Sequence, residues 1–350
     1  MTARVLFIAD YDAESGAGHL MRCTALARAL TGWGAETAFC ATDAAARGQV
    51  EKAGAQWLGC TELRSRSDCT DEILQQFARR SGFDLAVVDS YRVTGSALRA
   101  LGRVLPVACF DDLQAEALPV AAVINGNITC DEGRYASLYS GMATELYLGT
   151  RYNVLRDEFS SGELAPVKSR VSDVLLSTGG SDPHDASVHI AKYMLSSRSL
   201  RGRALHVMVG PLNRNIKTLR ALEAADKRLD VQVGVADVSC LMRGCDYAVA
   251  AAGTTLNELC ACGVPSITYS LADNQDDCAR IFAEKGAAIS LGRFPGDAFF
   301  YSLETSMRRM AACPETRRKI AFTASNLFDG RGAHRLAEAL SGMIARKQDD

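Results

Sequence analysis

The stretch that decides the fold lies near the N-terminus, where residues 5–9 read Val-Leu-Phe-Ile-Ala and residues 16–19 read Gly-Ala-Gly-His. The short, continuous apolar run predicts a buried strand, and Leu20–Leu30 has apolar residues at helical spacing. A glycine turn between a strand and a helix N-terminus directs backbone N–H groups and the positive end of the helix dipole outward. We therefore expect this turn to face a phosphate or another anion, although tight packing alone also explains such a turn.

The same alternation of strand-like and helix-like segments continues along almost the whole chain. In the first half, the predicted strands are Val5–Ala9, Ala35–Ala41, Gln56–Gly59, Leu85–Asp89, Val107–Phe110 and Ala121–Asn125. In the second half, they are Val174–Ser177, Leu205–Val209, Asp230–Val233, Tyr247–Ala251, Ser266–Tyr269 and Ala287–Leu291. The predicted helices are Asp71–Arg80, Ser96–Leu101, Asp185–Leu195, Ile216–Ala225, Thr254–Cys262, Asn274–Lys285 and Ala333–Arg346. This alternation is typical of parallel sheets covered by helices on both faces.

The length of 350 residues favours two domains. The less periodic region 149–170 separates the two strand series. We therefore predict an α/β protein with two doubly wound, Rossmann-like domains. The expected division is an N-terminal domain at 1–150, a linker at 151–170, a C-terminal domain at 171–330 and a final helix within 331–350.

Composition narrows the range of partners. The chain is 48% apolar and 23% charged, as in an ordinary soluble globular protein, and its net charge of -2 without a long basic run argues against nucleic acid or a membrane as a partner. No apolar stretch has the length of a signal-peptide core or a membrane span. The twelve cysteines form no CxxC pair and no zinc-type cluster. We expect a cytoplasmic protein whose cysteines are small buried hydrophobes.

Ligands of open parallel sheets bind beyond the carboxyl ends of the strands, so the residues there are the candidate site. In the first half these are Asp10, Gly16–His19, Asp89–Tyr91, Asp111–Asp112 and Asn125–Asn127. In the second half they are Thr178–Asp182, Gly210–Pro211, Ala252–Thr255 and Ala272–Gln275. None of these segments is a GxGxxG fingerprint or a GxxxxGK[ST] phosphate loop. They are rich in glycine, hydroxyl, amide and carboxylate groups, as a nucleotide site requires.

His19 is the candidate base among the five histidines. It occupies the first turn of its predicted helix, where the dipole disfavours an imidazolium, and this position predicts a neutral imidazole near pH 7. A neutral imidazole is what a general base requires. His189 and His206 fall in apolar patterns and are expected to be packing residues. His184 is expected at a helix start, and His334 on the surface.

Two glycine segments of the second half precede predicted helices. Ser181 or Asp182 is expected to cap one helix, with Pro183 at its first position, while Gly179 and Gly180 allow a diphosphate to approach the backbone. The other segment is residues 253–258, with sequence Gly-Thr-Thr-Leu-Asn-Glu. Its hydroxyls suit phosphate oxygens and its glutamate suits a ribose diol. A capped helix with a solvated glutamate is the alternative.

Three further segments allow a purely structural interpretation. Ala272–Gln275 fits an N-cap box, Tyr91 fits a half-buried loop aromatic residue, and Asp111–Asp112 fits a helix cap before Leu113.

Taken together, these segments resemble a known family. Residues 16–22, Gly-Ala-Gly-His-Leu-Met-Arg, resemble the G-x-G-H-x-x-R signature of the UDP-sugar hydrolases of pseudaminic acid biosynthesis. The substrate of that family is UDP-2,4-diacetamido-2,4,6-trideoxy-β-L-altropyranose. The other matching segments are Val88–Tyr91, Phe110–Asp112, Tyr147–Tyr152, Arg156–Phe159, Ser177–Asp182, Gly253–Glu258 and Ala272–Gln275. The chain is longer than the compact members of the family and has more cysteines.

The resemblance implies a GT-B fold like that of the peptidoglycan N-acetylglucosaminyltransferase. It also implies a UDP-sugar cleft between the domains, with uridine diphosphate mostly on the C-terminal domain and the last helix crossing back to the first domain. The catalytic residues expected from it are His19, Tyr91 and Asn274. The substrate-binding residues that we predict are Gly16, Gly18, Arg22, Asp89, Gly179, Gly180, Ser181, Gly253, Thr254, Thr255, Glu258 and Gln275.

The chemistry of the leaving group shapes the predicted mechanism. A nucleoside diphosphate is a stable anion, so it needs positive helix ends rather than the acid carboxyl of a glycosidase. We expect His19 to deprotonate a water that attacks the anomeric carbon with inversion, and no metal or cofactor to take part. The alternatives are a GT-B glycosyltransferase with a hydroxyl acceptor and a nucleotide-sugar sensor without turnover.

Overall fold

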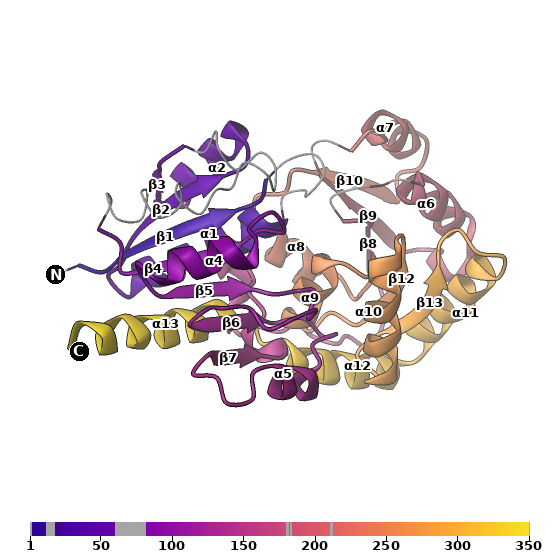
Figure 1. Cartoon of the computed structure of the whole chain (residues 1–350). Helices are drawn as coiled ribbons and strands as arrows, with labels where there is room; N and C mark the ends of the chain where they lie inside the picture. Colours follow the sequence, from indigo (N-terminus) through magenta and orange to yellow (C-terminus); the bar gives the residue numbers. More distant parts are fainter. Residues whose placement is uncertain are drawn as a thin grey trace. The chain divides into compact units, whose positions relative to one another are not determined.

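The chain forms two compact units, each built on its own parallel sheet (Figure 1). The computed structural model describes residues 2–11, 18–59, 82–179, 182, 184–210 and 213–349. Unit 1 comprises Met1–Asp157 and Arg331–Asp350, and unit 2 comprises Glu158–Gly330. The predicted fold class, two doubly wound α/β domains, is confirmed. The predicted helix Asp71–Arg80 and the predicted site residues Gly16, Gly180 and Ser181 lie outside the described residues.

Unit 1 contains a seven-stranded sheet in the order β3-β2-β1-β4-β5-β6-β7, with neighbouring strands parallel throughout. Its strands are β1 (Arg4–Ala9), β2 (Glu36–Ala41), β3 (Gln56–Trp57), β4 (Leu85–Asp89), β5 (Val107–Phe110), β6 (Ala122–Asn125) and β7 (Glu145–Leu148). Its helices are α1 (Gly18–Gly32), α2 (Arg47–Lys52), α4 (Gly95–Gly102), α5 (Glu132–Leu138) and α13 (Gly332–Asp349), with short 3₁₀ turns at Ala44–Ala46 and Thr150–Tyr152.

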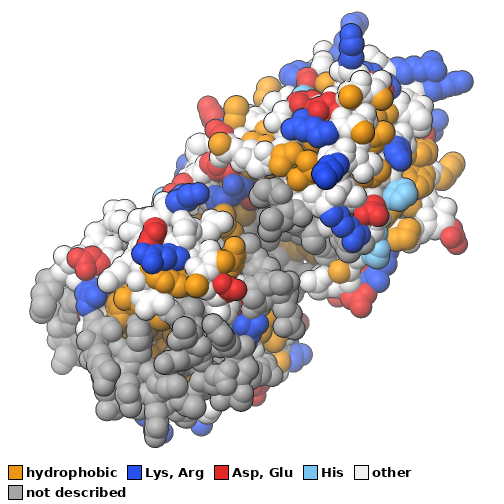
Figure 2. Space-filling view, turned by 90° about the horizontal axis from the view of Figure 1, so that it is seen from above, with side chains coloured by type: hydrophobic (Ala, Val, Ile, Leu, Met, Phe, Trp, Pro, Cys, Tyr) orange, Lys and Arg blue, Asp and Glu red, His pale blue; other side chains and the backbone are white. Residues whose placement is uncertain are grey.

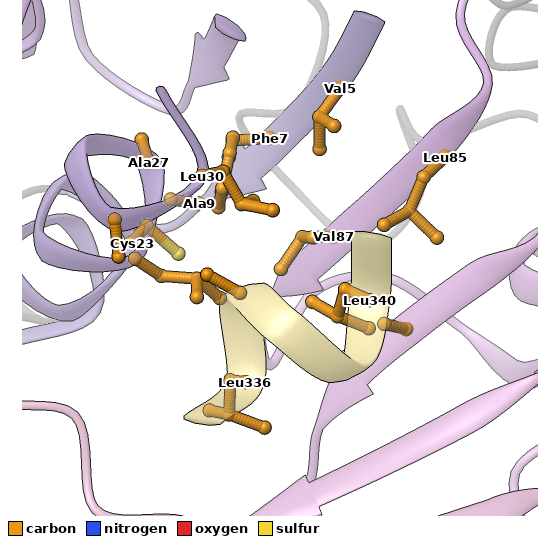
Figure 3. Packing of buried hydrophobic residues seen from close by; sticks show 14 of the residues in the cluster. Val5, Phe7, Ala9, Cys23, Ala27, Leu30, Leu85, Val87, Leu336 and Leu340 are labelled. Atoms are coloured by element: carbon orange, nitrogen blue, oxygen red, sulfur yellow. The ribbon is translucent and has the colours of Figure 1, made fainter. Parts of the chain in front are cut away.

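The core of unit 1 explains why β1 is apolar at every position from Val5 to Ala9. Each of these five side chains is at most 1% exposed. Val5, Phe7 and Ala9 pack with α1 and α13 on one face of the sheet (Figure 3), whereas Leu6 and Ile8 pack with α4 and α5 on the other. A strand covered on both faces has no side that tolerates polar residues. The helix α13 therefore belongs to the core of unit 1 although it ends the chain.

Unit 2 contains a six-stranded parallel sheet in the order β10-β9-β8-β11-β12-β13. Its strands are β8 (Asp173–Ser177), β9 (Ala204–Val209), β10 (Leu229–Val233), β11 (Tyr247–Ala251), β12 (Ser266–Ser270) and β13 (Ile289–Arg293). Its helices are α6 (Ala186–Ser196), α7 (Ile216–Ala225), α8 (Val238–Gly244), α9 (Thr254–Ala261), α10 (Asp273–Glu284), α11 (Phe299–Ala312) and α12 (Pro314–Leu327), with 3₁₀ turns at Asp157–Phe159 and Arg198–Leu200.

Several local predictions were wrong at element boundaries. The helix α6 begins at Ala186, and the Asp182 carboxylate accepts hydrogen bonds from the Ser187 backbone and hydroxyl. The predicted first position of this helix, Pro183, lies outside the described residues. The last strand begins at Ile289 rather than Ala287, because the backbone N–H of Ala287 closes the end of α10 on the Phe282 carbonyl.

Helices α2, α5, α8, α11 and α12 and strand β7 were not predicted. Strand β7 is at the sheet edge and only partly buried, so its apolar run is weak.

On the face shown in Figure 2, acidic and basic side chains are interspersed.

Ten described cysteines are free thiols, of which five are buried. In the part of the chain that the structure describes, no helix is long and apolar enough to cross a membrane.

The packing of α13 leads to a stability prediction. Leu340 is 0% exposed within the unit 1 core, so Leu340→Ala should reduce the free energy of unfolding by about 2–5 kcal/mol. Both tryptophans, Trp33 and Trp57, lie in unit 1, so tryptophan fluorescence during urea unfolding reports on this unit. The exposed Glu338 on the same helix supplies the control, because Glu338→Ala should leave the transition nearly unchanged. Equal transitions for the two variants would contradict the core position of α13.

Candidate active site

The carboxyl ends of adjacent strands in unit 1 bring together residues that are far apart in the sequence. Ala9, the last residue of β1, pairs in register with Asp89, the last residue of β4. Strand β5 lies beside β4, and Asp112 follows it by two residues. Helix α1 supplies His19 and Arg22, which share one helix face because they are three residues apart. These four side chains form a hydrogen-bonded cluster.

The central contact of the cluster joins His19 to Asp89. Nδ1 of His19 lies 2.6 Å from Oδ1 of Asp89, and both side chains are buried. A carboxylate only accepts hydrogen bonds, so the proton of this contact is on Nδ1. Among the described residues, Nε2 has no hydrogen-bond partner. Asp89 therefore fixes the orientation of the imidazole and leaves Nε2 available for proton transfer.

Arg22 occupies the space between two carboxylates. Its Nε and Nη2 donate to Asp89 at 2.5 and 2.6 Å, and its Nη1 and Nη2 donate to Asp112 at 3.1 and 2.7 Å. The guanidinium also lies over the ring of Phe110, 4.6 Å from the ring centre. This planar fork holds the two carboxylates in fixed positions.

The electrostatics of the cluster raise the pKa of His19. Burial by itself lowers the pKa of His19, but the hydrogen bond and the negative charge of Asp89 more than offset it, so the pKa lies above 6.5. Burial alone raises the pKa of Asp89, yet the adjacent Arg22 and His19 hold it well below its usual value. The carboxylate thus outweighs the effect of burial and makes His19 a stronger base than a free imidazole.

Tyr91 lies beside the histidine. The two rings meet edge to face with centres 4.7 Å apart. The Tyr91 hydroxyl donates to Oδ2 of Asp112 at 3.1 Å, and its backbone N–H donates to the buried Asp10 at 2.9 Å. Tyr91 is 42% exposed and so forms an outer wall of the cluster.

The structure places two predicted substrate-binding residues within this cluster. Asp89 is 1% exposed, and the guanidinium of Arg22 donates to both carboxylates. Asp112 and Asn127 belong to the strand-end segments that the sequence singles out, and the structure joins them by a hydrogen bond of 2.7 Å. Gly18 begins α1 and is exposed.

Other histidines also differ from the predictions. His206 is not a packing residue, because its two ring nitrogens contact Asp230 and Asp173 at 2.9 and 3.1 Å. His189 is exposed.

In unit 2, the predicted residues also follow strand ends, and the side chain of Gln275 lies next to Gly253. Gly179 follows β8 with a φ of +77°, a conformation that suits glycine. Next to it, Thr178 is 3% exposed, and its hydroxyl has no hydrogen-bond partner within the structure as described. Gly253 precedes α9, whose first turn contains the exposed Thr254 and the buried Thr255, and Glu258 lies one turn further on.

The start of α10 carries the remaining predicted residues. Asn274 is exposed in the first turn, and the side chain of Gln275 accepts a hydrogen bond from the backbone of Leu271 at 2.9 Å. The N-cap box that the sequence suggested is not formed, because Ala272 at the N-cap has no side-chain cap and Gln275 accepts from the residue before it. Asn274 remains a predicted site residue.

The fold defines a class of protein. Two doubly wound parallel-sheet domains form the GT-B glycosyltransferase type of fold. MurG of Acinetobacter baumannii superposes with a TM-score of 0.68 at 15% identity, over 97% of this chain and 99% of that chain. A putative UDP-N-acetylglucosamine 2-epimerase from Listeria monocytogenes also gives 0.68 at 12% identity, over 99% and 98%. These similarities concern the fold.

Sequence comparison finds more specific relatives, although no protein family model matches the chain. The spore coat polysaccharide biosynthesis protein SpsG of Bacillus subtilis is 25% identical over 230 residues, which are 65% of this chain and 66% of that protein. A UDP-N-acetylglucosamine–N-acetylmuramyl-(pentapeptide) pyrophosphoryl-undecaprenol N-acetylglucosamine transferase of Anaeromyxobacter sp. strain K is 32% identical over 123 residues, 34% of this chain and 32% of that protein. The aligned regions thus span about two thirds and one third of these relatives.

The contact between His19 and Asp89 yields a prediction about proton affinity. Asp89→Asn keeps the shape of the side chain but removes its charge, so the pKa of His19 should fall, because burial then acts without the carboxylate. The measurement is an NMR titration of the histidine Cε1–H signals, with His19 assigned by its loss in His19→Gln.

His206 in unit 2 is the internal control for this titration, since its own carboxylate partners raise its pKa and are untouched by the substitution. A His19 signal that titrates as in the unsubstituted protein would contradict the proposed pairing. Circular dichroism checks that Asp89→Asn remains folded.

Proposed function

We propose that this protein acts on a nucleoside diphosphate sugar and that His19 is the general base that activates the attacking hydroxyl group at the anomeric carbon. The observation that carries the proposal is the buried contact of 2.6 Å between His19 and Asp89 at the carboxyl edge of the unit 1 sheet. The edge beyond the strands is where open parallel sheets bind their ligands. The carboxylate gives the imidazole the tautomer that a base needs.

The charges around His19 support this role. Two carboxylates and one guanidinium leave one negative charge in excess while His19 is neutral. When Nε2 takes a proton from the nucleophile, the cluster becomes neutral. The developing imidazolium is therefore stabilised by groups that are already in place, so little reorganisation is needed during the reaction.

The leaving group is assigned to unit 2 in this proposal. The backbone at Gly179 and the N-terminus of α9, with Thr254 and Thr255, suit the diphosphate, because helix N-termini attract anions. Glu258 suits the ribose hydroxyls. Gly253, Asn274 and Gln275 complete the proposed set on this unit, with Asn274 directed to the sugar or the nucleophile.

The nucleophile distinguishes two candidate activities. The transferases among the relatives support transfer of the sugar to a hydroxyl acceptor, and we take glycosyl transfer as the first candidate. The second candidate is hydrolysis of a UDP-2,4-diacetamido-trideoxy sugar, with water as the nucleophile. The residues His19 and Arg22 within the G-x-G-H-x-x-R pattern support it. The same base serves both reactions.

An isotope experiment separates the two candidates. The purified protein is incubated with UDP-N-acetylglucosamine or UDP-2,4-diacetamido-2,4,6-trideoxy-β-L-altropyranose in ¹⁸O-water, with and without a pool of hydroxyl acceptors. Release of free sugar labelled at the anomeric carbon establishes hydrolysis. Acceptor-dependent release of UDP with an unlabelled glycoside establishes transfer. Binding of the sugar nucleotide without any turnover would contradict both activities.

Removal of the base gives the second prediction about activity. His19→Ala should reduce turnover by about 10²–10⁴, which is the usual contribution of a general base. The matched control is His334→Ala, because His334 is exposed on α13. Undiminished turnover in His19→Ala would refute the assignment of the base.

The pH dependence follows from the direction of the pKa shift. Only the neutral imidazole accepts a proton, and the pKa of His19 lies above 6.5. The value of kcat/KM should therefore fall on the acid side of its pH profile, with an apparent pKa higher than 6.5. Asp89→Asn should move this acid limb of the profile to lower pH. If the acid limb of the kcat/KM profile does not move in Asp89→Asn, the group that titrates there is not His19.

A further inference from the structure

The carboxylate of Asp112 accepts hydrogen bonds from both Arg22 and Tyr91, the two residues that contact His19 from other sides than Asp89. Asp112 follows β5, and its oxygens accept four hydrogen bonds. These come from Nη1 and Nη2 of Arg22 at 3.1 and 2.7 Å, from Nδ2 of Asn127 at 2.7 Å and from the Tyr91 hydroxyl at 3.1 Å. We propose that Asp112 is a positioning residue that holds both Arg22 and Tyr91 in the geometry that His19 needs for proton transfer. The inference rests on the proposed function of His19.

One arm of this arrangement runs through Arg22. The guanidinium bridges Asp112 to Asp89, and Asp89 in turn orients the imidazole. A planar fork with carboxylates on both sides has little freedom to rotate. If the carboxylate at position 112 is lost, Arg22 keeps only one anionic partner, and the orientation of Asp89 is less restricted. The effect of Asp112 on His19 through this arm is both geometric and electrostatic.

The other arm runs through Tyr91. Its ring is T-shaped against His19 at 4.7 Å, and Asp112 anchors its hydroxyl end. The backbone of the same residue is fixed independently, because its N–H donates to Asp10. Asp112 thus determines where the ring lies, whereas Asp10 determines where the main chain lies. A ring in this position limits the directions from which a nucleophile approaches the imidazole.

Asp112 is not itself a second acid or base. Burial alone raises its pKa, but Arg22 and Asn127 hold the pKa below its usual value, so it stays ionised near neutral pH. Its four donors occupy both oxygens. An ionised carboxylate whose acceptor sites are used can orient its neighbours, but it has no proton to give.

The neighbouring residue Asp111 differs from Asp112, because its carboxylate bonds only to groups that hold the local chain. Oδ1 of Asp111 accepts from the backbone N–H groups of Leu113 and Gln114 at 3.1 and 3.0 Å, and its Oδ2 accepts from the Tyr135 hydroxyl at 2.9 Å. This turn fixes the chain after β5. The sequence suggested a helix cap for the pair before Leu113, and this was wrong, because no helix begins there and the next helix is α5. Asp111 closes a turn instead, whereas Asp112 has the positioning role that we propose.

The groups around His19 also indicate the expected response to pH. From α1 it faces Arg22, which lowers its pKa, while Asp89 after β4 and Asp112 after β5 raise it. Tyr91 contacts it through the ring. Asp111 is instead hydrogen-bonded to the backbone of the following turn and to Tyr135. Replacement of Asp112 by a neutral side chain should therefore lower the pKa of His19, and replacement of Asp111 should not.

The test compares Asp112→Asn with Asp111→Asn in the full-length protein. For Asp112→Asn we expect kcat to fall about 10-fold to 100-fold, the scale of a small misplacement of catalytic groups. The Kd for UDP, measured by calorimetry, should stay unchanged, because the diphosphate is assigned to unit 2. The acid limb of kcat/KM and the NMR titration of His19 should both move to lower pH. For Asp111→Asn we expect lower thermal stability with an unmoved His19 titration.

A third variant separates the two arms. Tyr91→Phe removes the hydroxyl that Asp112 holds and leaves Arg22 in place. Its kcat should fall while the His19 titration stays near that of the unsubstituted protein. The double variant Asp112→Asn/Tyr91→Phe loses the contact between Asp112 and the Tyr91 hydroxyl only once. Its fall in kcat should therefore be smaller than the product of the falls in the two single variants.

The outcomes also separate this inference from the proposed function. If Asp112→Asn leaves both kcat and the His19 titration unchanged, or if Asp111→Asn shifts the titration equally, the positioning role is refuted. If no sugar nucleotide is turned over by the unsubstituted protein, the proposed function fails. In that case the NMR comparison still decides whether Asp112 controls the environment of His19.

Discussion

The interaction on which the site depends is the buried bridge of Arg22 between Asp89 and Asp112. Two carboxylates in a poorly solvated place repel each other, and the guanidinium makes their approach favourable. Because Arg22 and His19 lie on the same helix face, the bridge also sets the position of the imidazole. The strands contribute by ending at the same edge of the sheet. If Arg22 were lost, the two carboxylates would be left close together without their counter-charge, and breaking a buried ion pair in this way costs about 3–5 kcal/mol.

The bridge both holds α1 in place and affects the proton affinity of His19. The charge that keeps α1 fixed over the ends of β4 and β5 also raises the proton affinity of His19. A helix N-terminus alone favours the neutral imidazole, so the expected base would be weak. The carboxylate reverses this balance, since a direct hydrogen bond at 2.6 Å acts at shorter range than the dipole of a helix end. The result is a base whose conjugate acid is stabilised in advance by neighbouring groups.

The fold and the base do not by themselves define the acceptor. Structures with closely similar TM-scores include a transferase and a putative epimerase, which carry different chemistry on the same pair of doubly wound domains. The sequence relatives add weight to transfer, and the motif around His19 adds weight to hydrolysis. Glycosyl transfer and hydrolysis would use the same proton transfer to His19. The attacking hydroxyl of an acceptor and a water molecule differ mainly in the space that they need.

Much of this protein follows from its sequence alone. The continuous apolar runs and the helical spacing between them determined two parallel-sheet domains, because strands covered on both faces exclude polar residues. The glycine turn singled out His19, since it follows a strand directly. The edge strand β7 escaped detection, because it is only partly buried and its apolar pattern is weak. Helix α11 was missed although it buries Phe299, Leu303, Met307 and Met310 at helical spacing.

The tertiary structure decided what surrounds His19. Asp89, Asp112 and Asn127 are separated from it by 70 or more residues in the chain, and no local pattern states which of the strand-end carboxylates faces the imidazole. Their neighbourhood arises from strand order β1-β4-β5-β6, which the sequence does not encode locally. Proton affinity depends on distance and burial in three dimensions. The sequence therefore singled out His19 as the base that we propose, and only the fold decided the tautomer of His19, its partners and the direction of its pKa shift.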